Sequence, residues 1–353
     1  MNRWTTTIQA INPDTGEQTE YMGPLAIGDT EQDAKRYLDT NGMGYATIQG
    51  KYVGEVDLKS LKPDARHRNL LLRAGVYERK YARLFRAILK KQYKQASEAY
   101  PSQYTVNPDD YREVLTKLYT EVLPKEAQQA WDDYVKPLVK PPNSGELKKD
   151  FFDDLMGLLN ISVGDGEWIR IWRDAARQWL DLNILTKITN IAQTTQRAIA
   201  KVIEDSLNSE SSSIDDVRRA IERAADGEVN KQRALLIART ETMTALNKGR
   251  RLAMYSSGLE WQKIWVDTPD NRTRLSHRYI AQEAYRPLDE PYWLLNKNGL
   301  PEPAQHPGDP QLSAENCINC RCVEDYEVVR DEAGRPVRRT NKPSMSMELA
   351  EVI

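Results

Sequence analysis

The stretch YERKYARLFRAILKK, residues 77–91, lies in a helical pattern that starts near residue 66 and continues for nearly 200 residues. At about 100° of rotation per residue, one face of the stretch carries apolar side chains, namely Tyr77, Tyr81, Leu84, Phe85 and Ile88. The opposite face carries a basic stripe, namely Arg79, Arg83, Arg86 and Lys90. The pattern predicts an amphipathic helix at the start of an extended, mainly helical middle region.

The charge imbalance is strongest between Arg66 and Lys94, where ten Lys and Arg residues face a single acid, Glu78. A solvated helix face explains such a run, because charged side chains commonly serve solubility. Contact with DNA phosphates or with an acidic protein surface explains it as well. The four residues of the basic stripe are therefore candidates for contact with nucleic acid or with a protein partner.

The composition indicates a soluble protein of two or three domains, since 353 residues exceed the roughly 100 to 200 residues of one domain. The 50 basic and 52 acidic side chains nearly cancel, so an anionic partner must meet a local patch. No secretory signal begins the chain, and no apolar run approaches the roughly 20 residues of a membrane span. We expect synthesis in a cytoplasm, no membrane partner, and three reduced cysteines.

Residues 1–58 differ in pattern from the rest and predict a small ββαββ module of unassigned role. Two extended stretches, Trp4–Ile11 and one ending at Tyr21, precede a short helix that Thr30 and Asp33 cap. Two further stretches flank Gly50-Lys51, a pair that is typical of a hairpin turn.

The rest of the chain changes from helical patterns to a strand and loop pattern near residue 259, and together with residues 1–58 this predicts the α+β fold class. We expect a helical region with the basic stripe at 66–140, a helical body at 150–258 and a compact loop-rich α+β module at 259–328. Residues 329–353 are expected to form a mobile tail or an arm that orders on a partner. Prolines in residues 136–145 predict a stiff linker. Pro124 is expected to separate two helices of the first region.

An apolar seam in the helical body predicts core packing or subunit contact. Its members are Trp168, Ile171, Trp172, Trp179, Leu182 and Leu185. After this body, Trp261 to Val266 alternate with the period of a strand.

All three cysteines lie within six positions, as Cys317-x-x-Cys320-x-Cys322. Zinc prefers four Cys and His ligands in a tetrahedron, and His277 and His306 lie in the same loop-rich module. A structural Zn²⁺ site would close a loop that is too polar to be held by burial. The alternative is that the cysteines are small, buried apolar residues.

The block from Asp267 to His277 concentrates acid, guanidinium and imidazole groups. One interpretation makes His277 a general base that Asp267 or Asp270 orients. The other is structural: Arg272 and Arg274 bind carboxylates, and Thr273 caps a helix that carries His277. The structural interpretation is favoured, because no nucleophile elbow, phosphate loop or acid pair completes a catalytic set.

Four motifs together resemble the Mu F-like phage head morphogenesis family, also called minor head proteins. They are IARTETMTALNKGR at 237–250, a tryptophan strand, an Asp/Arg-Thr-Arg/His block ending at residue 277, and ENCINCRC at 315–322. The resemblance covers roughly residues 160–328. The residues that match its pattern are Arg239, Thr240, Glu241, Asp267, Arg272, Thr273, Arg274, His277, Asn319, Cys320, Arg321 and Cys322. Cys317 is extra to that pattern, which makes His277, Cys320 and Cys322 the preferred ligand core.

The resemblance implies a non-enzymatic virion protein that joins the portal protein, with major capsid or scaffold proteins as further partners, during procapsid assembly. It implies a location inside the capsid near the portal vertex, and in some cases ejection with the DNA. The residues leave two alternatives open. One is a metal-dependent nuclease or hydrolase using His277 and Asp267, and the other is an internal DNA-binding head protein without portal contact.

Overall fold

The computed structural model describes residues 2–11, 18–22, 26–28, 30–40, 47–51, 65–139, 165–208, 213–268 and 273–339. The chain divides into two compact units. One contains Met1–Asn69 with Gln262–Glu327, and the other contains Leu70–Trp261 with Val328–Ile353. The architecture is mostly helical with small antiparallel sheets, consistent with the predicted α+β class. Among the described helices, none combines the length and hydropathy needed to cross a bilayer.

The N-terminal sheet is organised around β1 (Asn2–Ile11), which pairs antiparallel with three other strands. These are β2 (Gln18–Met22), β3 (Ala26–Gly28) and β4 (Thr47–Lys51). Between β3 and β4 lies α1 (Glu31–Thr40), which Thr30 and Asp33 cap reciprocally as predicted. Leu38 of α1 is fully buried, so this helix covers a small core of its own.

The hairpin predicted across Gly50-Lys51 is wrong, because both residues lie within β4. Gly50 pairs with Thr5 and Lys51 with Trp4, and the register shifts next to this point. The register passes from Gly50 to Ile48, so Gln49 is the extra residue of a β-bulge, and glycine is common beside such an irregularity. The expected second strand of that hairpin, residues 52–56, lies outside the described residues.

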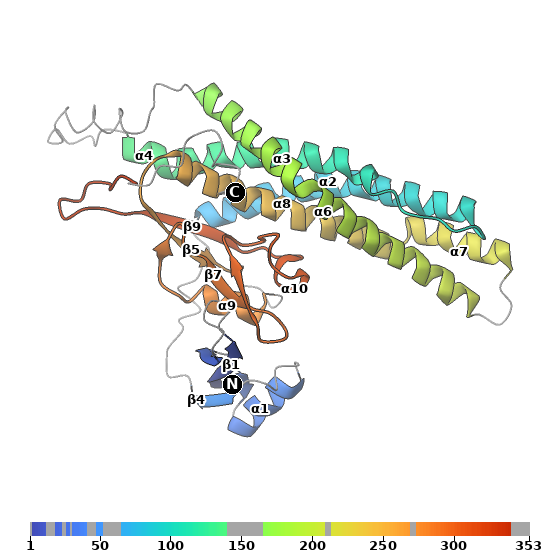
Figure 1. Cartoon of the computed structure of the whole chain (residues 1–353), viewed down its shortest axis with the longest axis horizontal. Helices are drawn as coiled ribbons and strands as arrows, with labels where there is room; N and C mark the ends of the chain where they lie inside the picture. Colours follow the sequence, from blue (N-terminus) through green and yellow to red (C-terminus); the bar gives the residue numbers. More distant parts are fainter. Residues whose placement is uncertain are drawn as a thin grey trace. The chain divides into compact units, whose positions relative to one another are not determined.

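The helical unit contains long antiparallel and crossing helices, which Figure 1 shows as a layer of ribbons from cyan to orange. They are α2 (Ala65–Ala99), α3 (Arg112–Ala130), α6 (Asp165–Leu207), α7 (Ile214–Asp226) and α8 (Glu228–Ser256). A 3₁₀ turn, Pro108–Tyr111, precedes α3. The helical period of the sequence therefore predicted that this part of the chain is helical, whereas its division into two regions, 66–140 and 150–258, stays a prediction.

The break predicted at Pro124 is wrong, since Pro124 lies inside α3. The helix continues through a π turn, Trp131–Val135, into α4 (Lys136–Val139). The linker expected at residues 136–145 therefore begins no earlier than residue 140, and its remainder lies outside the described residues. Proline interrupts a helix through local backbone terms, and here tertiary packing of α3 outweighs them.

Helix α8 lies at the centre of the unit, and from Glu241 to Tyr255 every side chain is buried. Gly249 permits the closest approach: a Cβ atom at this position would lie 2.4 Å from the Leu123 carbonyl oxygen of α3. A helix that is buried on all sides packs against neighbours around its whole circumference. This explains why the sequence of α8 from Glu241 to Tyr255 carries no amphipathic pattern.

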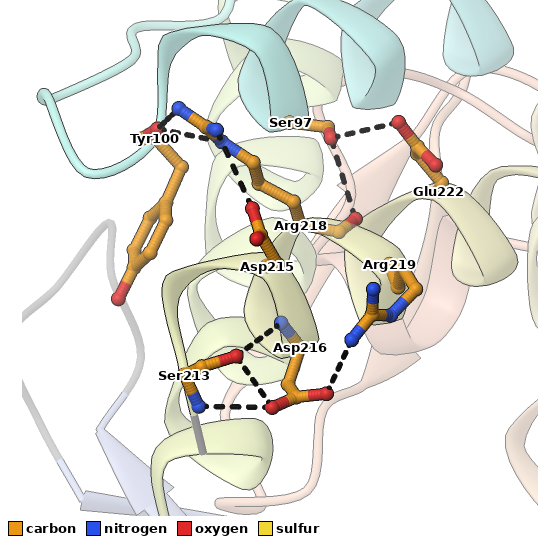
Figure 2. Close-up of polar contacts among 8 residues, drawn as sticks. All are labelled: Ser97, Tyr100, Ser213, Asp215, Asp216, Arg218, Arg219 and Glu222. Carbon is orange, nitrogen blue, oxygen red and sulfur yellow. Dashed lines mark hydrogen bonds and ion pairs between the residues drawn. The ribbon is translucent and has the colours of Figure 1, made fainter.

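Helix α7 is fixed to the C-terminal end of α2 by a polar cluster (Figure 2). Arg218 donates from Nε and Nη2 to the Tyr100 carbonyl at 3.0 and 2.7 Å. Ser97 donates to the Arg218 carbonyl and to Glu222. A capping box between Ser213 and Asp216 begins the helix, and these hydrogen bonds hold the pKa of Asp216 well below its usual range.

The apolar seam of α6 is only partly a core. Trp168, Trp172 and Trp179 are buried, and the Trp131 ring lies 5.0 Å from Trp168. Leu182 and Leu185, however, are 71% and 62% exposed, so of the two predicted roles core packing does not apply to them, and subunit contact stays a prediction. The buried stripe instead follows Leu180, Ile184 and Ile188, because the helix turns these positions inward.

The C-terminal module contains a three-stranded sheet in the order β6-β5-β9 and a separate hairpin of β7 and β8. The strands are β5 (Trp261–Val266), β6 (Arg286–Pro287), β7 (Tyr292–Leu295), β8 (Pro301–Ala304) and β9 (Val323–Val328). Strand β5 has the predicted bounds and alternates in burial. Two short helices complete the module, α9 (Leu275–Ile280) and α10 (Ala314–Cys317).

The segment after β9 folds back instead of forming a mobile tail, at least as far as residue 339. The Val329 amide donates to the Glu260 carbonyl, and the Glu260 amide donates to the Val337 carbonyl, both at 2.9 Å. The Arg339 amide donates to the Gly258 carbonyl at 3.1 Å. Backbone pairing compensates for the low apolar content that suggested disorder. Residues 340–353 lie outside the described residues.

Candidate metal centre

His277, Cys320 and Cys322 come together from two parts of the C-terminal module. His277 lies on α9, and both cysteines lie on the loop between α10 and β9. The Trp265 ring of β5 packs edge-on against the His277 ring, with centroids 5.2 Å apart. Asn319 has a φ of 63°, so the chain turns sharply just before Cys320. A core residue of the sheet and a left-handed turn thus position the three side chains.

The three donor atoms are close, buried and arranged at distances suited to a tetrahedral ion. His277 Nδ1 lies 3.4 Å from Cys322 Sγ and 3.5 Å from Cys320 Sγ. All three ligand atoms lie within 4.8 Å of one another. Zinc–nitrogen and zinc–sulfur bonds of about 2.0 and 2.3 Å place N and S about 3.6 Å apart across a tetrahedral edge. The residues present therefore fit a zinc ion.

The two cysteines differ electrostatically. The hydrogen bond from Cys322 holds the pKa of the Cys320 thiol well below its ordinary value against the effect of burial, and His277 adds to this lowering. Burial raises the pKa of the Cys322 thiol, and the neighbouring Cys320 raises it further. The pair therefore favours one thiolate beside one thiol, and a bound cation would favour the second thiolate.

Cys317 and His306, the other two predicted ligands, make different contacts. The Cys317 thiol donates to the Gly308 carbonyl at 3.7 Å, and its side chain packs on the core that contains Cys320 and Cys322. His306 is buried, and its Nδ1 donates to the Pro307 carbonyl at 3.0 Å. Within the described residues, the group close enough to share an ion contains His277, Cys320 and Cys322 alone.

The Asp/Arg-Thr-Arg/His block holds the cysteine loop by backbone contacts. Arg274 donates to the Ile318 carbonyl rather than to the predicted carboxylate. Thr273 donates to the Thr268 carbonyl, and Arg274 occupies the N-cap position predicted for Thr273. Thr268 in turn donates to the Arg321 carbonyl at 2.9 Å. The described contacts of this block therefore reach backbone carbonyls, whereas the structural interpretation expected carboxylate partners for Arg274 and a capping role for Thr273.

The block also contains two acids, Asp267 and Asp270, of which the structure describes only Asp267. The carboxylate of Asp267 lies near Cys322, where its charge contributes to the raised pKa of that thiol. Asp270 and Arg272 lie outside the described residues.

Glu302 of β8 anchors the other side of the cysteine loop, and sequence reasoning missed it. Its carboxylate accepts hydrogen bonds from Asn316, Asn296 and Ser313 at 2.9 to 3.1 Å. Burial opposes ionisation, but these hydrogen bonds hold the pKa of Glu302 below its usual value. No local motif marks Glu302, because Ser313 and Asn316, at the start of α10, lie 11 and 14 positions away in the sequence.

The Arg-Thr-Glu motif of α8 consists of buried structural contacts within the helical unit. Arg239 Nε donates to Glu78 Oε2 of α2 at 3.1 Å. Glu241 accepts from the Tyr119 hydroxyl and from Lys187 Nζ, both at 2.7 Å. Thr240 donates to the Leu236 carbonyl of its own helix. The acid and base of this motif are therefore paired inside the unit and do not face solvent.

A second buried acid, Glu126 of α3, was not recognised in the sequence. Arg73 of α2 binds it through two hydrogen bonds of 3.0 and 2.7 Å, and Arg250 of α8 lies 3.5 Å away. Glu126 and Glu78 are alike in that each forms ion pairs with arginines of other helices. A charge count along one helix cannot identify such acids.

The basic stripe of α2 is divided between paired and open positions. Lys90 and Arg86 lie 3.0 and 3.9 Å from the Asp226 carboxylate of α7. Arg79 and Arg83 are exposed, and neither makes an ion pair with any described residue. The stripe therefore offers two of its four predicted cations to a partner, whether nucleic acid or protein.

Residues 191–324 match the family model described as Phage Mu protein F like protein, and this match confirms the resemblance drawn from the motifs. The matched segment begins in α6, includes α7, α8 and β5, and ends in β9, so it contains both the Arg-Thr-Glu motif and the candidate metal centre. Neither curated proteins nor solved structures gave a match to the chain.

Proposed function

From the premise that residues 191–324 form a Phage Mu F-like region, we propose that this protein acts in phage head morphogenesis as a non-enzymatic component of the virion. The observation that carries the proposal is that the residues matching the family motifs make contacts that hold the fold together. Arg239 and Glu241 form buried ion pairs between helices, and the Asp/Arg-Thr-Arg/His block holds a loop. These are contacts of a scaffold rather than of a reaction centre.

We further propose that the protein joins the portal protein during procapsid assembly and lies inside the capsid near the portal vertex. In this setting it is a candidate for ejection with the DNA. The exposed pair Arg79 and Arg83 supports a contact with an acidic protein surface or with packaged DNA, because both guanidinium groups are available to an anionic partner.

Coexpression with the portal protein encoded by the same phage tests this proposal. Size-exclusion chromatography with light scattering should give a joint peak whose mass exceeds that of the portal assembly alone. A charge reversal of the open cations, Arg79→Glu with Arg83→Glu, tests whether the basic stripe contributes to that peak. Separate elution of the wild-type chain at micromolar concentration would contradict portal association.

We propose a structural Zn²⁺ ion at His277, Cys320 and Cys322. When bound, such an ion supplies charge and cross-links α9 to the cysteine loop, which contains few apolar side chains. Three protein ligands leave one of the usual four positions to water or to another donor group. Metal analysis of the purified chain should find about one zinc per chain, and a metal-free, fully stable chain would contradict the proposal.

The hydrolase alternative fits the geometry less well. A general base needs an orienting hydrogen bond from its second ring nitrogen, as in a Ser-His-Asp arrangement. His277 Nδ1 faces the two sulfur atoms, and no described residue forms a hydrogen bond with its Nε2. Phosphodiester turnover that disappears in His277→Ala while the fold persists would support the enzyme instead.

A further inference from the structure

The outer face of α2 continues the basic stripe toward the N-terminus of the helix with two apolar residues. Leu72 and Val76 are 70% and 57% exposed, and Arg79 and Arg83 follow at spacings of three and four positions. Alternating steps of four and three residues place side chains along one seam of a helix, the geometry in which a second helix packs alongside. Two apolar residues on this seam are followed by two open cations.

The outer face of α6 has the complementary arrangement. Leu182 and Leu185 are 71% and 62% exposed, and the exposed residues Gln178 and Asp174 lie one and two turns before Leu182. Asp174 forms an ion pair with Arg177 of its own helix at 3.1 Å, and both side chains are more than half exposed. Such a pair contributes little, so Asp174 can exchange to another cation. Read from its leucines, the α6 seam therefore ends in an acid, Asp174, whereas the α2 seam ends in a base, Arg83.

The two seams match in register when the helices run antiparallel. From Leu72 to Arg83 is eleven positions, and from Leu185 back to Asp174 is also eleven. At 1.5 Å per residue both seams are roughly 16 Å long. Leu72 then lies opposite Leu185, Val76 lies at the level of Leu182, and Arg83 lies opposite Asp174.

We propose that the α2 seam of one chain binds the α6 seam of a second copy of this chain. One contact then covers both exposed apolar pairs, Leu72 with Val76 and Leu182 with Leu185, and places Arg83 against Asp174. Nucleic acid explains the two arginines, but not the apolar residues that precede them on the same seam. The contact is heterologous, because it joins different surfaces of identical chains, and it therefore allows growth beyond a dimer.

The association is expected to be weak, because two short helix seams bury less area than a stable protein–protein interface. Sedimentation velocity of the full chain, metal-loaded and without portal protein, should show a weight-average mass that rises with concentration up to about 1 mM, a range that detects millimolar dissociation constants. Leu72→Glu and Leu185→Glu each remove one of the two surfaces. Each variant alone should remain monomeric.

The decisive experiment mixes the two variants. Leu72→Glu retains the α6 seam and Leu185→Glu retains the α2 seam, so an equimolar mixture should form a complex of two chains and nothing larger. The matched control is Leu207→Glu, which changes another exposed leucine of α6 and should associate as the wild type does. Circular dichroism should be unchanged in all three, because the substituted side chains are exposed.

Charge exchange gives an independent measurement. Arg83→Asp and Asp174→Arg should each weaken association, whereas the double variant should restore it because the charges are reversed on both surfaces. A wild-type chain that stays monomeric at about 1 mM would overturn the proposal. So would a mixture of the two leucine variants that stays monomeric, or binding of short DNA duplexes that depends equally on Leu72 and Arg83. Portal association is measured separately with Leu185→Glu, which leaves Arg79 and Arg83 of α2 unchanged and should still join the portal protein if the two contacts are distinct.

Discussion

Arg239 of α8 donates to Glu78 of α2 at 3.1 Å, although 161 positions separate the two residues in the chain. Glu78 is the only acid between Arg66 and Lys94, and Arg239 is the basic residue of the Arg-Thr-Glu motif. Both side chains are mostly buried. The only acid of this basic segment, Glu78, and the arginine of the Arg-Thr-Glu motif, Arg239, thus form one ion pair.

Removal of one partner of this ion pair should be costly. Glu78→Ala leaves the Arg239 guanidinium buried without its carboxylate, so we expect a loss of about 3 kcal/mol in the free energy of unfolding. Urea unfolding followed by circular dichroism measures the loss. Glu98→Ala removes the partner of Lys94 in an exposed pair and should cost less than about 1 kcal/mol. Equal effects of the two substitutions would contradict a buried structural role for Glu78.

Gly249→Ala should destabilise the helical unit by about 1–3 kcal/mol, because the added Cβ meets the Leu123 carbonyl oxygen and the backbone must shift. The matched substitution is Gly75→Ala on α2, where the nearest atom to the new Cβ is the end of the flexible Arg79 side chain at 3.4 Å. Alanine favours a helix over glycine by about 0.5–1 kcal/mol, so this control should stabilise. Thermal unfolding should show a lower melting temperature for Gly249→Ala and a higher one for Gly75→Ala than for the wild type.

The candidate metal centre makes a prediction that separates neighbouring cysteines. Cys320→Ser should abolish zinc retention, whereas Cys317→Ser should retain it, because the Cys317 thiol contacts the Gly308 carbonyl instead of the three-ligand group. Cobalt substitution gives a second measurement, since absorption from cobalt–thiolate bonds should be present in Cys317→Ser and absent in Cys320→Ser. Equal metal content in the two variants would indicate that the ligands lie elsewhere.

Glu121 of α3 predicts a loss of stability in acid. Burial opposes its ionisation, but hydrogen bonds from Lys80, Tyr81 and Lys125 lower the pKa of Glu121 to about 2. A carboxyl group with a lowered folded-state pKa stabilises fully above its unfolded pKa of about 4.3, and this contribution is lost as pH falls toward 2.

The comparison of wild type with Glu121→Gln isolates that contribution. The wild type should exceed the variant by about 1–2 kcal/mol at pH 6, a discounted value because the carboxylate is partly exposed. The difference should shrink as the pH falls from about 5 to 2. A difference that stays constant over this range would show that the charge of Glu121 does not stabilise the fold.

DNA binding, if the open cations of the basic stripe provide it, should depend on salt and on Arg79 and Arg83. Arg79→Glu with Arg83→Glu should weaken binding of duplex DNA and lower the slope of log K against log salt by roughly two, because two phosphate contacts are lost. The control is Lys90→Glu, which removes a cation already paired with Asp226 and should change the slope less. Fluorescence anisotropy across a salt series measures both slopes.

Local signals in the sequence predicted most elements of the helical unit. The helical pattern that starts near residue 66 gave the long helices, and the predicted cap of Thr30 and Asp33 began α1. The alternation of Trp261 to Val266 gave β5 with its correct bounds. These signals succeed because caps and periods act over a few residues, within the element that they define.

Local signals failed wherever a distant segment decided the outcome. Pro124 stays helical because α8 packs closely on α3 at Gly249, and the segment after β9 is ordered because residues 258–260 accept and donate its backbone hydrogen bonds. Leu182 and Leu185 are apolar but exposed, since the buried side of α6 is set by the helices beside it. Among the five predicted metal ligands, spacing alone did not separate His277 from His306.

The sequence by itself determined the α+β class, the long helices and the grouping of three cysteines with two histidines in one module. It did so because helical period, strand alternation and residue type are properties of short stretches. Only the tertiary structure decided that Glu78 and Glu126 receive arginines from other helices, that Arg86 and Lys90 pair with Asp226, and that His277 faces Cys320 and Cys322. Those pairings depend on which faces of distant segments meet, and no local pattern contains that information.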